Sequence, residues 1–288
     1  MCPSSARSGP AEARATPRRT TIGVFDSGVG GLTVLKALLQ VVPDADYLYF
    51  GDTARLPYGS KSAETVSKYA ILAARHLERH HAQLLVIACN TASALALDGL
   101  RQALRVPVIG VVEPGAEQAA LESKNRRAVV LGTQATIASH AYLKALAARG
   151  IEAREQACPL LVPLVEEGWI EHPVTEQVSR IYLDEAFSEG YESADTVLLG
   201  CTHYPLLKPL LRRLAPEHAA IIDSAQSTAQ AVAKVLGQGV PVNPALGERR
   251  YAPRLRFFAT DSAEKFRCLG TRFLGHSIQD VVHVDLRE

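Results

Sequence analysis

The stretch TIGVFDSGVGGLTVL, residues 21–35, decides the fold class. Residues 22–25 form a short apolar run that ends in a polar turn, which is the pattern of a buried β-strand. The turn DSGVGG at 26–31 is rich in glycine, and apolar residues then recur at helical spacing from Leu32 to Leu39. The stretch therefore predicts a strand, a glycine-rich loop and a helix.

The same pattern returns along the rest of the chain. Further strands are expected at 47–50, 84–88, 108–112, 128–131, 196–200, 221–223, 254–259 and 281–284, and further helices at 62–81, 139–148 and about 225–236. Pro114-Gly115 is expected to stop the strand at 108–112. Apolar strands that alternate with helices predict an α/β fold with mostly parallel sheets, covered on both faces.

The second half of the chain repeats the first. Cys89 follows the loop residue Asp26 by 63 positions, and Cys201 follows Gly132 by 69. The acidic end of the next strand comes 24 positions after the first cysteine and 22 after the second. We therefore predict two similar, pseudo-symmetric α/β domains with the active site in the cleft between them. After a disordered leader at 1–20, the first domain comprises 21–113 plus 224–288, and the second comprises 114–223.

The composition argues against several classes of protein. The 288 residues carry 31 Lys and Arg against 30 Asp and Glu, which gives no support to a nucleic-acid-binding surface. Five cysteines without a CxxC pair argue against a disulfide framework or a zinc ribbon, and for a reducing cytoplasm. No apolar run approaches the ~20 residues of a membrane helix, and the leader lacks a secretory signal. We expect a cytoplasmic protein that needs no metal, membrane or nucleic acid.

Cys89 and Cys201 each end a predicted buried strand, where open α/β sheets bind ligands. Asn90 or Thr91 is expected to cap a helix after the first cysteine, and Thr202 after the second, so that the helix ends lower the pKa of both thiols. Inversion of an α-carbon needs a base on one face and an acid on the other, and two thiols meet this need without a cofactor. The alternative is that both are small buried apolar residues.

Other residues have weaker signals. The loop at 26–31 suits a carboxylate ligand, although a tight turn capped by Asp26 explains it too; it is neither GxGxxG nor a Walker motif. His203 can polarise Cys201, serve a structural role or belong to a metal site. Glu166-Glu167 reads most simply as a solvated helix face, and Tyr58-Gly59 as a pocket wall or a turn.

Six stretches carry a resemblance to a known family: GVFDSGVGGLTVL (23–35), YFGDTARLPYGSKS (49–62), LLVIACNTASALAL (84–97), VIGVVEPG (108–115), CPLLVPLVEEGW (158–169) and LLGCTHYPLL (198–207). On these stretches the chain resembles the glutamate racemases of the aspartate/glutamate racemase superfamily. The resemblance covers about residues 21–285.

The resemblance implies two α/β domains, with Cys89 and Cys201 as the two catalytic acid/bases between them. It implies that Asp26 assists Cys89, and that His203 and Glu167, preferred here over Glu166, assist Cys201. It implies substrate contacts at Asp26, Ser27, Tyr58, Gly59, Asn90, Thr91, Thr202 and His203. Finally, it implies a cofactor-independent enzyme, a homodimer, that converts L-glutamate to D-glutamate for peptidoglycan in a bacterial cytoplasm.

Three alternatives stay open. A racemase for another amino acid, such as aspartate, would share the fold and both thiols. A catalytically silent binding or regulatory protein would keep the fold without turnover. A pyridoxal-phosphate racemase is disfavoured, because no lysine lies in a persuasive setting for a Schiff base.

Overall fold

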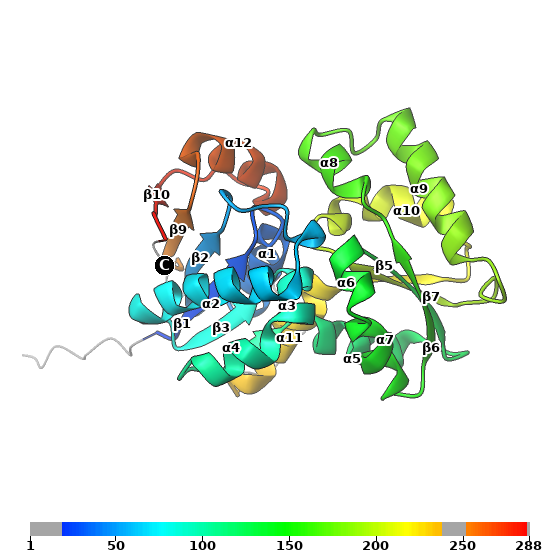
Figure 1. Cartoon of the computed structure of the whole chain (residues 1–288), viewed down its shortest axis with the longest axis horizontal. Coiled ribbons are helices and arrows are strands. Elements are labelled where there is room, and N and C mark those ends of the chain that lie inside the picture. Colours follow the sequence, from blue (N-terminus) through cyan, green and yellow to red (C-terminus); the bar gives the residue numbers. More distant parts are fainter. Residues whose placement is uncertain (1–18, 238–251, 287–288) are drawn as a thin grey trace, which may run out of the picture.

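The computed structural model describes residues 19–237 and 252–286, which Figure 1 shows as two adjoining lobes. Of the leader predicted at 1–20, residues 1–18 lie outside the described residues. The first strand begins at Thr21, where the sequence pattern begins. Within the described ranges, no helix is long and apolar enough to cross a membrane.

One lobe is built on a six-stranded sheet with the order β10-β9-β2-β1-β3-β4, and all of its paired strands are parallel. Its strands are β1 (Thr21–Asp26), β2 (Asp46–Gly51), β3 (Leu84–Ile87), β4 (Val108–Gly110), β9 (Leu255–Ala259) and β10 (Val281–His283). Its helices are α1 (Leu32–Val41), η1 (Tyr58–Ser60), α2 (Ala63–Arg79), α3 (Asn90–Leu95), α4 (Leu97–Ala103), α11 (Ser224–Val235) and α12 (Ala263–Leu274).

The other lobe is built on a four-stranded parallel sheet with the order β6-β5-β7-β8. Its strands are β5 (Arg127–Gly132), β6 (Glu152–Ala157), β7 (Thr196–Gly200) and β8 (Ala220–Asp223). Its helices are α5 (Val112–Glu122), α6 (Gln134–Ala138), α7 (Ala141–Ala147), α8 (Leu161–Glu166), α9 (Pro173–Ala186), η2 (Tyr204–Leu207) and α10 (Lys208–Leu214).

The two sheets share one strand order. The run β2-β1-β3-β4 of the larger sheet matches β6-β5-β7-β8, so that β1 is equivalent to β5 and β3 to β7. This repeat confirms the predicted α/β fold of two similar units with parallel sheets. The domain boundaries themselves stay predictions: that at 113/114 falls inside α5, and that at 223/224 lies where β8 passes directly into α11.

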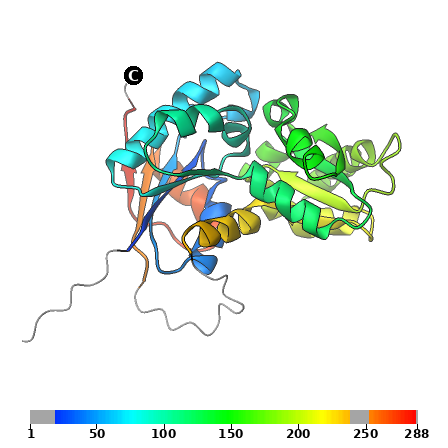
Figure 2. The same cartoon turned by 90° about the horizontal axis from the view of Figure 1, so that it is seen from below.

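Alternating strand residues pack on opposite faces of each sheet, because successive side chains of a strand point to opposite sides. In β5, Val129 and Leu131 join one apolar cluster, whereas Ala128 and Val130 join another. The first of these clusters also contains residues of β1, α1, α11 and α12, so it is continuous between the lobes. Helix α11 packs against both α1 and α5 and lies between the lobes in Figure 2.

Most of the predicted elements are present, but the strand at 108–112 was predicted too long. β4 ends at Gly110, and α5 begins at Val112. Pro114 and Gly115 therefore lie in the first turn of a helix, where proline is tolerated because its missing N–H would have no partner. Val111 and Val112 are buried, so an apolar helix start reads like the end of a buried strand.

Two further differences lie in the second lobe. The helix predicted at 139–148 corresponds to α7, which begins only at Ala141, after His140 with its left-handed φ of 54°. The short helix α6 before it lies in the segment predicted as a loop. The strand β6, with the sequence EAREQA, was not predicted. It forms an edge of its sheet and its residues are half-buried or exposed, so it lacks the apolar run that marks the central strands.

Candidate active site

Cys89 and Cys201 lie at equivalent places in the two sheets. Cys89 comes two residues after the end of β3, and Cys201 comes directly after β7, the strand equivalent to β3. Both cysteines are nearly buried, since each is only 5% exposed. Ligands of parallel α/β sheets bind at these carboxyl ends of the strands.

Cys89 itself, rather than Asn90 or Thr91, is the N-cap of α3. The Ala92 N–H donates to the Cys89 Sγ at 3.5 Å, and this sulfur lies 3.6 Å from the Ser27 Oγ. Burial and the nearby Asp26 raise the pKa of the Cys89 thiol to about 12, against the hydrogen bonds from Ala92 and Ser27. The predicted lowering of this pKa is therefore wrong, because loss of hydration outweighs the field of a six-residue helix.

Asp26 ends β1 beside Cys89 and is completely buried. Its Oδ2 accepts the Gly28 N–H at 2.9 Å, whereas its Oδ1 has no hydrogen-bond partner among the described residues. Burial raises the pKa of Asp26, although the charge of His203 and the N–H of Gly28 act in the opposite direction. Asp26 thus presents an unpaired acceptor close to the first thiol and within the field of His203.

The second cysteine begins the turn Cys201-Thr202-His203, which follows β7. Thr202 caps no helix: η2 begins at Tyr204, and the preceding residue, His203, makes no side-chain cap. The His203 Nδ1 lies 3.9 Å from the Cys201 Sγ and its Nε2 lies 3.0 Å from the Glu166 Oε1. Burial alone would lower the pKa of His203, but the contacts with Cys201 and Glu166 raise it to about 10.

Glu166, and not Glu167, lies beside His203. The side chain of Glu166 is 25% exposed, and its hydrogen bond with His203 lowers its pKa. Glu167 is exposed at the C-cap of α8. The sequence-based preference for Glu167 is therefore corrected to Glu166, because the end of α8 turns only one of the two neighbouring residues toward the histidine.

The glycine-rich loop of the first lobe approaches this turn of the second lobe. The Thr33 hydroxyl donates to the carbonyl of Thr202 at 3.1 Å. A side chain at Gly30 would overlap Thr202 and His203, so only glycine lets the backbone come this close. The loop and the turn thus bring Asp26 and His203 into one buried region.

Asn90 and Thr91, of the first lobe, contact side chains of the second lobe. The Tyr142 hydroxyl donates to the Asn90 Oδ1 at 2.6 Å, while the Asn90 Nδ2 has no partner in the described part of the chain. The Thr91 hydroxyl lies 3.0 Å from that of Thr133 and 3.1 Å from that of Thr136. Sequence reasoning did not single out Tyr142, Thr133 or Thr136, although Thr133 begins the loop equivalent to that of Asp26.

Ser27, Tyr58 and Gly59 border the same region. Ser27 contacts Cys89, as described above, whereas the buried Tyr58 donates its hydroxyl to the Asp52 Oδ2 at 2.6 Å. The Tyr58 hydroxyl is thus committed to the protein. A Cβ at Gly59 would lie 2.8 Å from that of Thr133, so this glycine packs against the second lobe.

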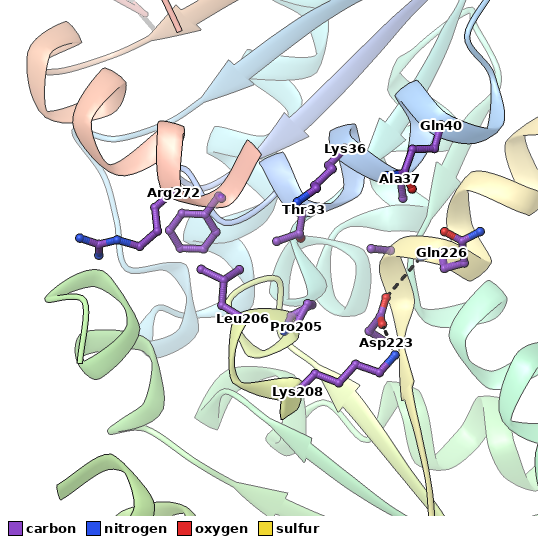
Figure 3. A pocket seen from close by; sticks show the side chains of 12 residues that line it. Thr33, Lys36, Ala37, Gln40, Pro205, Leu206, Lys208, Asp223, Gln226 and Arg272 are labelled. Carbon is purple, nitrogen blue, oxygen red and sulfur yellow. Dashed lines mark hydrogen bonds and ion pairs between the residues drawn. The ribbon is translucent and has the colours of Figure 1, made fainter. Parts of the chain in front are cut away.

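A separate cavity of about 450 Å³ lies between α1, η2, α10, α11 and α12, and neither thiol lines it. Figure 3 shows Lys208 paired with Asp223 there, at 2.7 Å, and Arg272 at its edge. Thr33, whose hydroxyl reaches Thr202, also lines it. The described residues contain no group of three or more His, Cys, Asp or Glu placed to hold a metal ion.

Comparisons with known proteins agree on one family. The family model of the Asp/Glu/Hydantoin racemases matches residues 22–232. A glutamate racemase of Koribacter versatilis is 56% identical over 286 residues, which cover 93% of this chain and 98% of that protein.

Solved structures give the same result. A glutamate racemase of Bacillus anthracis has a TM-score of 0.84 at 37% identity, and one of Francisella tularensis, in complex with D-glutamate, has 0.82 at 35%. Each of these two matches covers 93% of this chain and 98% of the solved chain. The chain therefore belongs to the Asp/Glu/Hydantoin racemase family, in its glutamate racemase branch, and is an isomerase.

Proposed function

We propose that the chain interconverts L- and D-glutamate by proton transfer between two cysteines, Cys89 and Cys201, without a cofactor. The observation that carries the proposal is the equivalence of β3 and β7, each of which leads into one of the two thiols. Racemisation is itself a nearly symmetric reaction, because its substrate and product are mirror images at one carbon. A duplicated fold with like groups at equivalent places suits such a reaction.

Two unpaired buried atoms are proposed to bind the substrate. A buried polar atom without a partner is unusual, and its hydrogen bond is expected to come from a ligand or from water. The Asp26 Oδ1 is an acceptor suited to the substrate ammonium group, and the Asn90 Nδ2 is a donor suited to a carboxylate. Thr91, Thr202 and the loop at Ser27 would supply further donors, while Tyr58 and Gly59 would shape the wall.

The reaction needs one thiolate and one thiol at the start of each turnover. The thiolate removes the α-proton and becomes a thiol, and the electron pair of the C–H bond passes to the α-carbon and its carboxylate. The opposite thiol donates its proton to the other face of that carbon and becomes a thiolate. The product is the other enantiomer, and the two sulfurs have exchanged roles, ready for the reverse reaction.

The two thiols have different charged neighbours. The raised pKa of Cys89 keeps it a thiol before substrate binds. Beside Cys201, the contacts of His203 with Cys201 and Glu166 raise the pKa of the histidine to about 10, so a positive charge lies 3.9 Å from the Cys201 sulfur, where it would stabilise the negative charge that proton transfer places there. Glu166 and His203 would thus serve Cys201, and Asp26 would serve Cys89. Donors fixed in a nearly buried site would stabilise the carbanion-like charge.

We further propose that the D-glutamate supplies peptidoglycan synthesis in a bacterial cytoplasm. Four thiols of the described residues, Cys89, Cys158, Cys201 and Cys268, are free, which suits a reducing compartment. The homodimer implied by the resemblance remains a prediction, which light scattering of the purified protein would test.

The test of the mechanism is polarimetry of purified protein with L-glutamate and no added cofactor. Cys89→Ser and Cys201→Ser are each expected to lose nearly all turnover, because a hydroxyl is a far weaker acid than a thiol and is not ionised at neutral pH, so it can neither release nor remove the proton readily. Cys268→Ser, an exposed thiol on α12, is the matched control and should keep full activity. If the protein racemises aspartate and not glutamate, the proposed substrate is wrong. If either single cysteine variant turns over glutamate at the rate of Cys268→Ser, the two-thiol mechanism is wrong.

A further inference from the structure

The C-terminal helix α12 belongs to the lobe of the larger sheet but reaches α8 and His203 in the other lobe. The Arg272 Nη1 donates to the backbone carbonyls of Val165 at 3.1 Å and of Glu166 at 2.9 Å. The adjacent Phe273 packs edge-on against the His203 ring, with 5.1 Å between ring centroids. Helix α12 therefore contacts both members of the His203–Glu166 pair.

The contact of Arg272 with α8 is made at the end of that helix. The last carbonyls of an α-helix have no partner within the helix, and cationic side chains often supply one. Helix α8 ends at Glu166, and Gly168 follows with a left-handed φ of 81°. A Cβ at Gly168 would lie 2.9 Å from the Arg272 Nη2, so this glycine both turns the chain and leaves room for the guanidinium.

We infer that Arg272 is a positioning residue for the reaction, which holds the end of α8 so that Glu166 stays paired with His203 beside Cys201. The inference rests on the proposed role of Cys201. Arg272 acts through the backbone of Glu166, since its hydrogen bonds go to carbonyl oxygens and the carboxylate itself contacts His203.

The charged groups around the pair set the sign of the expected change. His203 faces Cys201 on its own turn, Glu166 from α8 and Asp26 from the end of β1, while Lys265 of α12 acts on Glu166. When Glu166 is displaced, the imidazolium loses the carboxylate that favours it, and the pKa of His203 falls. The pH above which His203 is neutral then becomes lower, so the high-pH limb of kcat/KM moves to lower pH.

The experiment measures kcat and kcat/KM against pH for Arg272→Met and for Arg267→Met. Arg267 is a matched control on the same helix, where it donates to the carbonyl of Gln279 at 3.5 Å, away from α8. Arg272→Met is expected to lower kcat/KM about tenfold, as loss of an orienting partner typically does, and to shift its high-pH limb downward. Arg267→Met is expected to match the parent protein.

A double variant separates positioning from a general structural effect. Glu166→Gln should give the same limb shift, and Arg272→Met combined with Glu166→Gln should be no slower than Glu166→Gln alone, because both act through one contact. If the two losses multiply, or if Arg272→Met behaves like Arg267→Met, the inference is wrong. Should Arg272→Met fail to fold, Arg272→Gln, which lacks the cationic guanidinium, is the second variant, and a limb at the parent position in Arg272→Gln contradicts the inference.

Failure of the proposed function would look different. A Cys201→Ser variant that still racemises glutamate would remove the role of Cys201, whatever Arg272→Met does. A Cys201→Ser variant without turnover, together with an Arg272→Met variant that matches Arg267→Met, would contradict the positioning role alone.

Discussion

The hydroxyl of Tyr142, from the lobe of the smaller sheet, donates a 2.6 Å hydrogen bond to the Asn90 Oδ1, next to Cys89 in the other lobe. This bond fixes which way the Asn90 amide faces, because the oxygen is engaged and the Nδ2 has no partner among the described residues. The donor proposed to bind the substrate is therefore oriented by the opposite lobe.

Removing that bond should weaken substrate binding. Tyr142→Phe is expected to raise the KM for both enantiomers about fivefold, near the ~1 kcal/mol that one hydrogen bond contributes, with a smaller effect on kcat. Tyr191→Phe, which removes an exposed hydroxyl bound to Glu152, is the control. An unchanged KM in Tyr142→Phe would exclude the orienting role.

The neighbouring glutamates of α8 should differ in their effect on the pH profile. Contacts with Cys201 and Glu166 raise the pKa of His203 to about 10, and Glu166→Gln removes the second of these contacts, so the pKa of His203 falls. The high-pH limb of kcat/KM is then expected at lower pH. Glu167→Gln changes an exposed residue and should leave the profile unchanged. The opposite pattern would restore the assignment made from the sequence.

The buried carboxylate of Asp26 should destabilise the folded protein at neutral pH, although the proposed reaction uses it. Burial raises the pKa of Asp26 above its ordinary value of 3.8, so the folded state holds this proton more tightly than the unfolded state. The stability from this proton is present below pH 3.8 and is lost as the pH rises through the folded pKa. Asp26→Asn is therefore expected to unfold at a higher temperature than the parent at pH 7, with a smaller difference at pH 3.5, and to lose activity.

The control for this stability measurement is Asp44→Asn, since Asp44 is exposed. Thermal unfolding by circular dichroism at the two pH values gives the comparison. An Asp26→Asn variant that is less stable than the parent at pH 7 would show that the carboxylate stabilises the fold, contrary to this account.

The close approach of the lobes at Gly30 should be essential to turnover. Gly30→Ala introduces a methyl group that would overlap Thr202 and His203, so it must displace the turn that carries Cys201. A loss of about 10²-fold in kcat/KM is expected, as for a displacement of roughly 1 Å at reacting groups. Gly99→Ala is the control, because its Cβ would meet only Ile71 at 3.9 Å. Equal activity of Gly30→Ala and Gly99→Ala would contradict the close contact of Gly30 with Thr202 and His203.

Local pattern predicted the elements that are buried and repeated. The glycine loop after β1 and the apolar strands before Cys89 and Cys201 stand out, because a central parallel strand is apolar throughout. The edge strand β6 escaped prediction, since its residues are charged and partly exposed. The start of α5 at Val112 was mistaken for a strand, because a buried helix start carries the same apolar residues.

The site was less predictable where it depends on contacts between distant segments. Glu166 differs from Glu167 only in its phase at the end of α8, which the sequence does not specify. The hydrogen bonds of Tyr142 with Asn90 and of Arg272 with Glu166 join residues that are 52 and 106 positions apart in the sequence. The raised pKa of Cys89 follows from burial beside Asp26, which outweighs the local helix end that the sequence displays.

The most direct test of the two-thiol account follows the α-hydrogen during the first few per cent of reaction of L-glutamate in D₂O. Transfer between two monoprotic thiols on opposite faces predicts that the D-glutamate carries solvent deuterium, while the remaining L-glutamate keeps its hydrogen. D-glutamate that keeps the original hydrogen would mean that a single group moves the proton from face to face, and would contradict the account.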